Sequence, residues 1–460
     1  MLMDCKISII ITAHNYGKYL PKSLESALNQ NYDNFEVILV NDGSTDNTKK
    51  VIERYLHETK LKVIELDGVG LSSACNRGIL ESKGEYIVRL DADDWFDENL
   101  LLVESNFLDQ HADIDLVFCD YYTVNPHGEI IDNIQRAKVN DEIELLDRPA
   151  LAAGAMYRKT CYEKIGGYNE DIRYQEDYDF WIKFIEHFQV KNISLPLMFY
   201  RQHGHSMSRN WDTRMSARRL IKKQFVSENR NRYKDKVLAV IPARNDLIAQ
   251  TKIPLLQFSD SNLLNRCIKK TINADLVDKL IVLTNDSEIR DKAYESGADY
   301  VHMTNQLSYR DSKSNSIEVI LFDLLKFLYK EKKYKPEIIA VIHPNSPFLK
   351  SDHITEAIDS ILLYETDSVI AVLEDLSYHW KIGKHGLESV GYTKRVVRQE
   401  KDLIYKESGG LYVLKTDQFL QTHDLLGKKI GHIELSPIDS SRIYNEFDYW
   451  ISKQIEKNTN

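Results

Sequence analysis

Four acidic side chains crowd into seven residues of the segment LDADDWFD, which spans residues 90–97. Charges of one sign repel at this density, so a loop that only faces water gains nothing from them. A divalent cation relieves the repulsion, and Mg²⁺ and Mn²⁺ bind carboxylate oxygens together with substrate phosphates. The structural alternative is a calcium loop, but the spacing does not follow the EF-hand pattern. The segment therefore predicts a metal site that neutralises charge on a departing diphosphate.

A second acidic segment, YQEDYDFW at residues 174–181, places three acids at the start of a predicted helix. Negative charge near a helix N-terminus is favourable, which explains one of these acids but not all three. A carboxylate directed at an acceptor hydroxyl can serve as a general base. Glu176 and Asp177 are therefore candidates for catalysis.

Two further polar loops have residues that can contact a ligand. The loop NDGSTDNT at residues 41–48 follows the apolar run EVILV and is rich in turn residues. Asp42 within it can also accept a hydrogen bond from a nucleotide base. The segment YRQHGHSMS at residues 200–208 contains His203 and His205. A single histidine is usually structural, whereas histidines in a loop with Gly and Ser can reach a metal or a phosphate.

The elements that must position these loops form an alternating series. β-Branched runs at residues 7–12 and 36–40 flank a helical stretch at residues 20–30, and a second series starts at residue 237. Further runs lie at residues 63–66, 86–90, 116–119, 280–284, 338–343, 367–372 and 410–414. This rhythm predicts mostly parallel sheets covered by helices, with ligands at the carboxyl ends of the strands. We expect an α/β protein with two Rossmann-like nucleotide-sugar domains, since 460 residues exceed one typical domain.

Residues 211–236 interrupt the alternation with a helical, basic segment. Its cations are Arg214, Arg218, Arg219, Lys222 and Lys223. We interpret it as a linker helix between the domains. A basic amphipathic helix can also bind anionic lipid, and a solvated face packed on one domain is a third interpretation.

The composition narrows the class of protein. A net charge of −10 provides no basic field, so we expect no nucleic-acid partner. No apolar run approaches the ~20 residues of a membrane-spanning helix, and the N-terminus lacks the pattern of a signal peptide. The five cysteines are scattered without metal-ligand spacing, which favours reduced thiols. We therefore expect a cytoplasmic protein whose membrane contact, if its acceptor is lipid-linked, is peripheral at the inner face of the plasma membrane.

Four segments of the first 210 residues occur in a specific order: TAHNYGKYLPKSLESALNQNYDNFEVILVNDGSTDNT, GLSSACNRGILESKGEYIVRLDADD, GGYNEDIRYQEDYDFW and YRQHGHSMS. In this order they resemble the family 2 glycosyltransferases of the GT-A fold. The resemblance implies transfer of a sugar from a nucleotide-sugar donor with inversion of the anomeric centre. It also implies Mn²⁺ or Mg²⁺ as the cofactor.

The resemblance assigns donor and metal contacts to individual residues. Asp42 would read the nucleotide base, and Asn76 would lie near the nucleotide. Asp91 and Asp93 form the DxD element, in which Asp93 would be the direct metal ligand and Asp91 would also contribute to donor binding. His203 would approach the metal or the diphosphate.

The same resemblance assigns the chemistry of the acceptor. Asp177 matches the catalytic base, and Glu176 beside it would help to place the acceptor. One departure from the family is Cys75, which stands where many relatives carry an arginine before the asparagine. We expect a looser phosphate contact there.

The second half contains another ordered set of segments: VLAVIPARNDLIAQTKIPL, KLIVLTNDSEIRDKAYESGADY, IIAVIHPNSPFLKSDHITEAI, RQEKDLIYKESGGLYVLKTDQF and SPIDSSRIYNEFDYW. They resemble the acylneuraminate cytidylyltransferases, which make CMP-sialic acid and CMP-Kdo. The resemblance implies CTP or CMP as a ligand. It assigns this site to Arg244, Lys252, Asn345, Ser346, Arg398, Gln399 and Asp439. The expected domains are residues 1–210 and 237–460, joined by the linker at residues 211–236.

Two departures affect the second half. The first loop of that family is Gly-rich with Ser and Lys, and such loops cradle phosphates, but here it reads NDLIA at residues 245–249. The aspartate pair that holds the family's metal is replaced by Arg442 and Tyr444, or in a shifted alignment by Asp439 and Ser441. Either alignment breaks the carboxylate pair that Mg²⁺ prefers.

Three interpretations of the second half stay open. It is an inactive cytidylyltransferase-like domain, an active one that makes a CMP-sugar from CTP and a 3-deoxy-2-keto sugar acid, or a binding or dimerisation module. The resemblance implies a homodimer through this half. The occurrence of these two families together suggests synthesis of a surface polysaccharide, capsule or lipopolysaccharide, on a glycan or lipid-linked acceptor. This is an argument by association.

Overall fold

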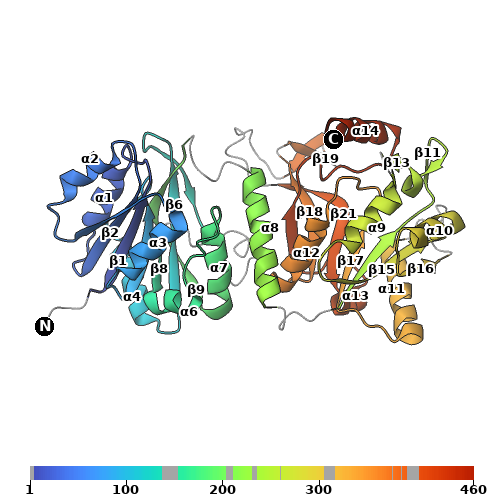
Figure 1. The fold of residues 1–460 in the computed structure, drawn as a ribbon, viewed down its shortest axis with the longest axis horizontal. Helices are drawn as coiled ribbons and strands as arrows, with labels where there is room; N and C mark the ends of the chain where they lie inside the picture. Colours follow the sequence, from blue (N-terminus) through green and yellow to red (C-terminus); the bar gives the residue numbers. More distant parts are fainter. Residues whose placement is uncertain are drawn as a thin grey trace. The chain divides into compact units, whose positions relative to one another are not determined.

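The computed structural model describes residues 5–136, 154–203, 211–229, 236–258, 261–304, 316–375, 377–384, 386–390 and 404–459. The predicted residues His205, Arg398 and Gln399 lie outside these ranges. The chain divides into two compact units, Met1–Ile221 and Lys222–Asn460. This division falls inside helix α8, Trp211–Glu228 (Figure 1).

The N-terminal unit is built on a nine-stranded mixed sheet whose core path is β3-β2-β1-β4-β8-β6-β9-β5. The parallel strands are β1 (Ile7–Ala13), β2 (Phe35–Asp42), β3 (Leu61–Leu66) and β4 (Tyr86–Asp91). The others are β5 (Trp95–Phe96), β6 (Leu116–Val124), β7 (Ile130–Ile134), β8 (Ala155–Arg158) and β9 (Val190–Arg201). Because β2 and β3 extend the sheet on one side of β1 and β4 joins on the other, the order of the parallel strands across the sheet reverses between β1 and β4. Ligands of such sheets bind at this switch point.

Alternation along β1 explains how helices cover both faces of this sheet. Ile9 and Ile11 pack with Leu20 and Leu24 of α1, whereas Ile10 packs in a separate cluster with Ile79 of α3. Successive side chains of a strand point to opposite faces, so a strand that is apolar throughout needs cover on both. The helices are α1 (Leu20–Leu28), α2 (Thr48–Ile52), α3 (Leu71–Leu80), α4 (Leu100–Gln110), α6 (Lys159–Ile165) and α7 (Glu176–His187) (Figure 1).

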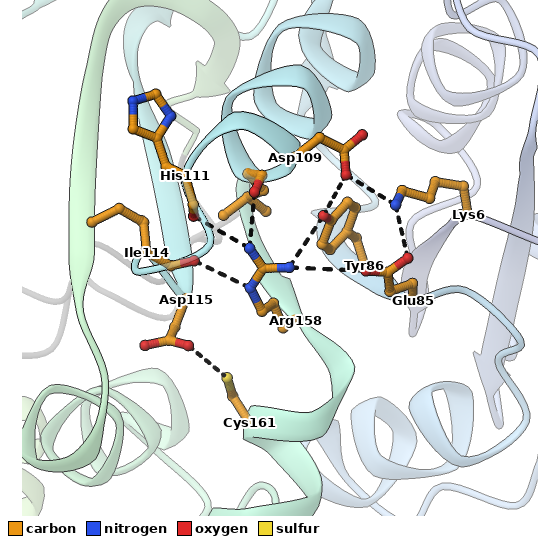
Figure 2. A network of polar contacts seen from close by, with 10 residues as sticks. Lys6, Glu85, Tyr86, Asp109, His111, Ile114, Asp115, Arg158 and Cys161 are labelled. Carbon is orange, nitrogen blue, oxygen red and sulfur yellow. Dashed lines mark hydrogen bonds and ion pairs between the residues drawn. The ribbon is translucent and has the colours of Figure 1, made fainter.

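Arg158, at the end of β8, fixes the start of β4 (Figure 2). Its guanidinium donates to the backbone carbonyls of Leu108 (2.8 Å), His111 (3.3 Å) and Ile114 (3.2 Å), and to the Tyr86 hydroxyl (3.2 Å). Carbonyls at a helix C-terminus lack partners within the helix, so a cation at the end of α4 is favourable. The network holds the amino end of β4, the strand whose carboxyl end carries the acidic segment.

The C-terminal unit contains a seven-stranded sheet in the order β16-β15-β10-β17-β21-β18-β22. Its strands are β10 (Val237–Pro242), β15 (Val277–Thr284), β16 (Tyr300–Met303), β17 (Ile338–Ile342), β18 (Ser368–Glu374), β21 (Tyr405–Lys415) and β22 (Ile430–Glu434). Only β21 runs antiparallel to its neighbours. The switch point lies between β10 and β17, because β15 and β16 extend the sheet on the other side of β10. The mostly parallel α/β architecture predicted for both halves is confirmed.

Helices and short hairpins complete the C-terminal unit. The helices are α9 (Leu263–Ile272), α10 (Ser287–Glu295), α11 (Ile317–Phe327), α12 (Ser351–Tyr364), α13 (Thr416–Thr422) and α14 (Glu446–Thr459). The two-stranded pairs are β11 (Leu247–Ile248) with β12 (Thr251–Lys252), β13 (Gln257–Phe258) with β14 (Ser261–Asn262), and β19 (His379–Gly383) with β20 (Gly386–Val390). None of the helices in the described ranges has both the length and the apolar composition needed to cross a membrane.

Basic side chains of α8 contact protein groups. Arg218 donates to Gln175 Oε1 (2.7 Å) within the first unit. Within the second unit, Lys223 Nζ lies 2.7 Å from Asp275 and the buried Lys222 Nζ lies 3.5 Å from Glu356. These contacts favour packing on protein over lipid binding as the role of the cations. The linker interpretation itself stays a prediction.

Candidate functional site

The acidic segment follows β4 at the switch point of the N-terminal sheet. Asp91 is the last residue of β4 and pairs with Thr12 of β1. The Oδ2 atom of Asp93 lies 2.8 Å from Nε2 of His203, which follows the end of β9. Two residues 110 positions apart that were predicted to share a metal are thus in contact.

Negative charge accumulates in this segment. Burial and the charge of Asp91 raise the pKa of Asp93, although the hydrogen bond to His203 opposes the shift. Burial, Asp93 and Asp91 raise the pKa of Asp94 well above its usual range. Asp94 Oδ1 accepts from the Arg201 backbone N–H (2.8 Å), whereas its buried Oδ2 has no hydrogen-bond partner among the described residues. The site therefore holds more carboxylate than its own cations neutralise.

These residues fit a divalent cation. Among the described residues, no group of three or more His, Cys, Asp or Glu side chains could hold a metal by itself. Mg²⁺, however, commonly takes one or two protein carboxylates and completes its shell with water and substrate phosphates. Asp93 and Asp91 provide such carboxylates, and His203 adds a nitrogen that suits Mn²⁺. A bound cation would relieve the electrostatic repulsion between these carboxylates.

The predicted catalytic pair opens helix α7. Gln175 precedes it with a φ of 63°, a left-handed conformation that is rare for a residue with a side chain and sets the direction of the first turn. Burial and the charge of Asp177 raise the pKa of Glu176 to about 7, with Arg89 opposing the shift. Burial also raises the pKa of Asp177, which is opposed by Arg89 and Arg218. The raised pKa of Asp177 makes this carboxylate a stronger base than an exposed aspartate, which suits a general base.

Arg89 joins the catalytic pair to the acidic segment, and the sequence analysis did not identify it. Its Nη1 donates to Glu176 Oε1 (3.2 Å), and its Nε and Nη2 lie 3.0 and 2.9 Å from Asp91 Oδ1. Burial would lower the pKa of this guanidinium, but Asp91, Cys75 and Glu176 raise it well above its usual range. The available signal was one arginine inside the apolar run YIVRL of β4.

Cys75 lies close to Arg89. Burial raises the pKa of the Cys75 thiol to about 12, with the Arg89 charge opposing, so the thiol stays neutral. The guanidinium near this position is that of Arg89, from strand β4.

Asn76 and Asp42 contact the protein itself. The Asn76 amide donates to Tyr168 O (2.9 Å) and Glu170 Oε1 (2.9 Å), and its oxygen accepts from Tyr162 OH (2.9 Å) and Tyr168 N (3.0 Å). These four bonds use its full capacity, so Asn76 anchors the segment before α7. The two carboxylate oxygens of Asp42 accept hydrogen bonds from two backbone N–H groups after β3, and these bonds hold that loop in place. Their contacts with a donor stay predictions.

In the C-terminal unit, two of the predicted residues, Lys252 and Asp439, are already paired with other side chains. Lys252 Nζ forms 2.7 Å ion pairs with Asp286 and Glu288. Asp439 Oδ1 lies 3.0 Å from Lys350 Nζ, and its Oδ2 accepts from Ser436 Oγ (2.8 Å). The only carboxylate offered by either alignment is therefore already neutralised. The residues of this unit do not fit the Mg²⁺ that the cytidylyltransferase resemblance implies.

Comparison with known families gives one match for each unit. Residues 8–166 match the family described as glycosyl transferase family 2, and residues 238–457 match the family described as cytidylyltransferase. Both matches lie inside the halves predicted for these families.

Sequence relatives cover less than half of the chain. Chondroitin synthase of Pasteurella multocida is 29% identical over 227 residues, which are 49% of this chain and 23% of that protein. Hyaluronan synthase of Pasteurella multocida is 30% identical over 190 residues, 41% of this chain and 19% of that protein. An uncharacterised glycosyltransferase of Rickettsia prowazekii is 30% identical over 195 residues, 41% and 60% of the two chains. The matched stretch thus spans less than two thirds of each of these relatives.

Solved structures also align with about half of the chain. S. aureus TarS in complex with UDP-GlcNAc has a TM-score of 0.42 and 22% identity, covering 48% of this chain and 66% of its own. The mannosyltransferase PcManGT of Pyrobaculum calidifontis, in complex with GDP-Man and Mn²⁺, has a TM-score of 0.37 and 18% identity. It covers 50% of this chain and 65% of its own.

Proposed function

Residues 8–166 match glycosyl transferase family 2 and residues 238–457 match the cytidylyltransferase family, and on this basis we propose that the N-terminal unit transfers a sugar. The donor is a nucleotide-sugar, and the acceptor is a glycan or a lipid-linked glycan. The observation that carries this proposal is the link through Arg89 between Asp91 and Glu176. This link places the acidic residues proposed to bind a metal ion and the acidic pair proposed to act as the base at the same end of the sheet.

The chain's own residues divide the reaction between them. Asp177 takes the proton of the acceptor hydroxyl, whose oxygen then bonds to the anomeric carbon of the donor. The bond from that carbon to the diphosphate oxygen breaks on the opposite side, so the anomeric centre inverts. Glu176, held by Arg89, orients the acceptor beside Asp177.

Asp93, Asp91 and His203 would hold Mn²⁺ or Mg²⁺. When bound, the ion would neutralise negative charge on the departing nucleoside diphosphate. Asp42 and Asn76 shape the loops around the donor through their contacts with the backbone after β3 and before α7.

The relatives support a proposal for the biological setting. Chondroitin and hyaluronan synthases are named among them, so we place the reaction in the synthesis of a surface polysaccharide such as a capsule or lipopolysaccharide. A lipid-linked acceptor would bring the protein to the inner face of the plasma membrane as a peripheral protein. Among nucleotide-sugars, we expect a UDP-hexose as the donor.

For the C-terminal unit we propose a binding module that does not catalyse nucleotidyl transfer. Asp439 is neutralised by Lys350, and no second carboxylate accompanies it in either alignment. A homodimer through this unit is consistent with the β19–β20 hairpin, where Trp380, Ile382 and Leu387 are exposed. The bifunctional alternative requires pyrophosphate release from CTP.

Donor turnover tests the proposed transfer. Release of the nucleoside diphosphate from UDP-, GDP-, TDP- and CMP-sugars would be measured with Mn²⁺, without an acceptor, and compared with Asp93→Ala. We expect turnover of one donor in the wild type and its loss in Asp93→Ala. Asp97→Asn is the matched control, because Asp97 belongs to the same acidic segment but contacts Asn99. Equal turnover by wild type and Asp93→Ala would reject the metal site.

A further inference from the structure

The residue that precedes the candidate base pair is held by a side chain of α8. Gln175, the N-cap of α7, has a left-handed backbone with a φ of 63° and a ψ of 36°. Its carbonyl accepts hydrogen bonds from the backbone N–H groups of Tyr178 (3.1 Å) and Asp179 (3.2 Å). These bonds close the first turn of α7, so the conformation of Gln175 sets the direction in which Glu176 and Asp177 leave the backbone.

The left-handed conformation of Gln175 needs support from outside its own helix. Such a conformation is strained for a residue with a Cβ, and it persists where the surrounding structure holds it. Among the described residues, the Gln175 side chain makes no capping hydrogen bond to α7. Its Oε1 atom instead accepts from Nε of Arg218, at 2.7 Å. Arg218 therefore fixes the side chain of the residue from which the first turn starts.

Arg218 also contacts the other side of the base pair. Its guanidinium lies over the ring of Tyr178, with Cζ 4.9 Å from the ring centroid. A cation at this distance from an aromatic face is favourable, and more so away from water. Tyr178 is fully buried, so its ring is a fixed surface for the guanidinium. One arginine thus contacts Gln175 before the pair and Tyr178 after it.

The charge of Arg218 acts on the base itself. Burial raises the pKa of Asp177, and the charges of Arg89 and Arg218 oppose this rise. Arg89 acts from β4, where it is paired with Glu176, whereas Arg218 acts from α8. An aspartate must be ionised to accept a proton, so both cations favour the form that a base needs.

We infer that Arg218 is a positioning residue for sugar transfer: through Gln175 and Tyr178 it holds the first turn of α7, and with it the base Asp177. The inference rests on the proposed function, in which Asp177 takes the proton of the acceptor hydroxyl. It gives one cation of the basic segment a task in the N-terminal unit. Because Arg218 acts through the base, it affects the chemical step and leaves the affinity for the donor to the residues around Asp93.

Steady-state kinetics of nucleoside diphosphate release from the active donor test this role in the intact protein. We expect Arg218→Met to lower kcat at least tenfold and to leave the KM for the donor within twofold of the wild-type value. Arg218→Lys keeps the charge and a hydrogen-bond donor but loses the planar group over Tyr178, so its kcat should lie between the two. A wild-type kcat in Arg218→Met would overturn the inference.

Lys223→Met is the matched control on the same helix. Lys223 is half exposed and its Nζ lies 2.7 Å from Asp275 of the C-terminal unit, so its loss should leave kcat unchanged. Thermal unfolding of each variant reports whether it is folded.

A double-mutant cycle tests whether Arg218 acts through Gln175. If it does, Gln175→Ala combined with Arg218→Met should lower kcat by less than the product of the two single losses, because both remove the same hydrogen bond. Losses that multiply in full would contradict the assigned route.

Hydrogen exchange separates failure of this inference from failure of the proposed function. Mass spectrometry of peptides that cover residues 174–181 would compare the wild type with Arg218→Met and Lys223→Met. We expect faster exchange of the Tyr178 and Asp179 amides in Arg218→Met alone, because their acceptor is the Gln175 carbonyl. A wild type that releases no nucleotide would reject the proposed function, whereas equal exchange in Arg218→Met and the wild type would reject the positioning role.

Discussion

The two units use one strand arrangement and opposite charges. In each, the first strand has its two successors on one side and the fourth parallel strand on the other, which places the switch points at β1/β4 and β10/β17. Asp91 ends β4 and Asp93 follows it, whereas Arg244 and His343 follow β10 and β17. The fold thus determines where a ligand binds, and the residues after the strands determine whether the site suits a metal or an anion.

Both units also use an asparagine to hold a distant segment. Asn76 anchors the segment that leads to Glu176 and Asp177, and Asn345 anchors the one that carries Arg442. The asparagine has the same holding role in both units. In the N-terminal unit it positions the candidate base, and in the C-terminal unit it positions the cation of Arg442. The N-terminal unit can therefore accept a proton, whereas the held segment of the C-terminal unit provides only a positive charge.

The largest predicted effect is loss of the base in the N-terminal unit. Asp177→Asn should lower the rate of sugar transfer by ~10³-fold, within the range for removal of a general base. Asp179→Asn is the matched control on the same helical turn, because Asp179 pairs with Lys183 at 2.6 Å. Initial rates with the active donor check this. Equal rates for Asp177→Asn and the control would remove the functional contrast between the units.

Arg89 tests whether the two acidic groups act as one site. Arg89→Met should destabilise the N-terminal unit by about 3–5 kcal/mol, since it leaves Asp91 and Glu176 without their buried cation. Among molecules that still fold, transfer should fall more than tenfold. Urea unfolding and initial rates measure the two effects. A variant with wild-type stability and rate would show that the link is incidental.

The pH dependence of transfer should reveal the raised pKa of the pair. Glu176 must be ionised to keep its ion pair with Arg89, so activity should be low in acid and rise with pH through about 7, where Glu176 titrates. Glu176→Gln removes this titrating group and should move the rise to lower pH. Rate profiles from pH 5 to 9 check the shift. An unchanged midpoint in Glu176→Gln would assign the titration elsewhere.

The smallest effect concerns a buried acid away from both switch points. Both oxygens of Glu104 on α4 lack hydrogen-bond partners in the described ranges, and burial raises its pKa well above the usual range. A raised folded pKa gives stability below the unfolded value that is lost as pH rises through the folded value. Glu104→Met should therefore stabilise the protein by about 1–3 kcal/mol at pH 8 and by less at pH 5. Urea unfolding at the two pH values measures this, and a loss of stability at pH 8 would contradict it.

Local patterns predicted the strands well because each is a continuous β-branched run. The runs at residues 7–12, 86–90 and 237–241 lie inside β1, β4 and β10. The order of the motifs identified Asp93 and His203, and the structure places them in contact. Sequence could not show that Arg89 bridges two motifs, because its partners are 2 and 87 residues away on different elements.

Long-range pairing also changed the meaning of residues in the second half. Lys252 looked available for phosphate, but its ion pairs with Asp286 and Glu288 depend on where α10 begins. Arg442 looked like a missing carboxylate, and only the clamp by Asn345 reveals it as a held cation. The sequence shows which residue stands at each of these positions, but it does not show the partner that determines the role of that residue.

The most direct test of a catalytic and a non-catalytic unit in one chain is a single incubation followed by chromatography of the nucleotides. The intact protein would receive the donor panel, CTP and a 3-deoxy-2-keto sugar acid, with Mn²⁺ and Mg²⁺ present. We predict that one sugar nucleotide is converted to its nucleoside diphosphate while CTP remains intact. Formation of a CMP-sugar with pyrophosphate, or survival of every donor, would contradict the account.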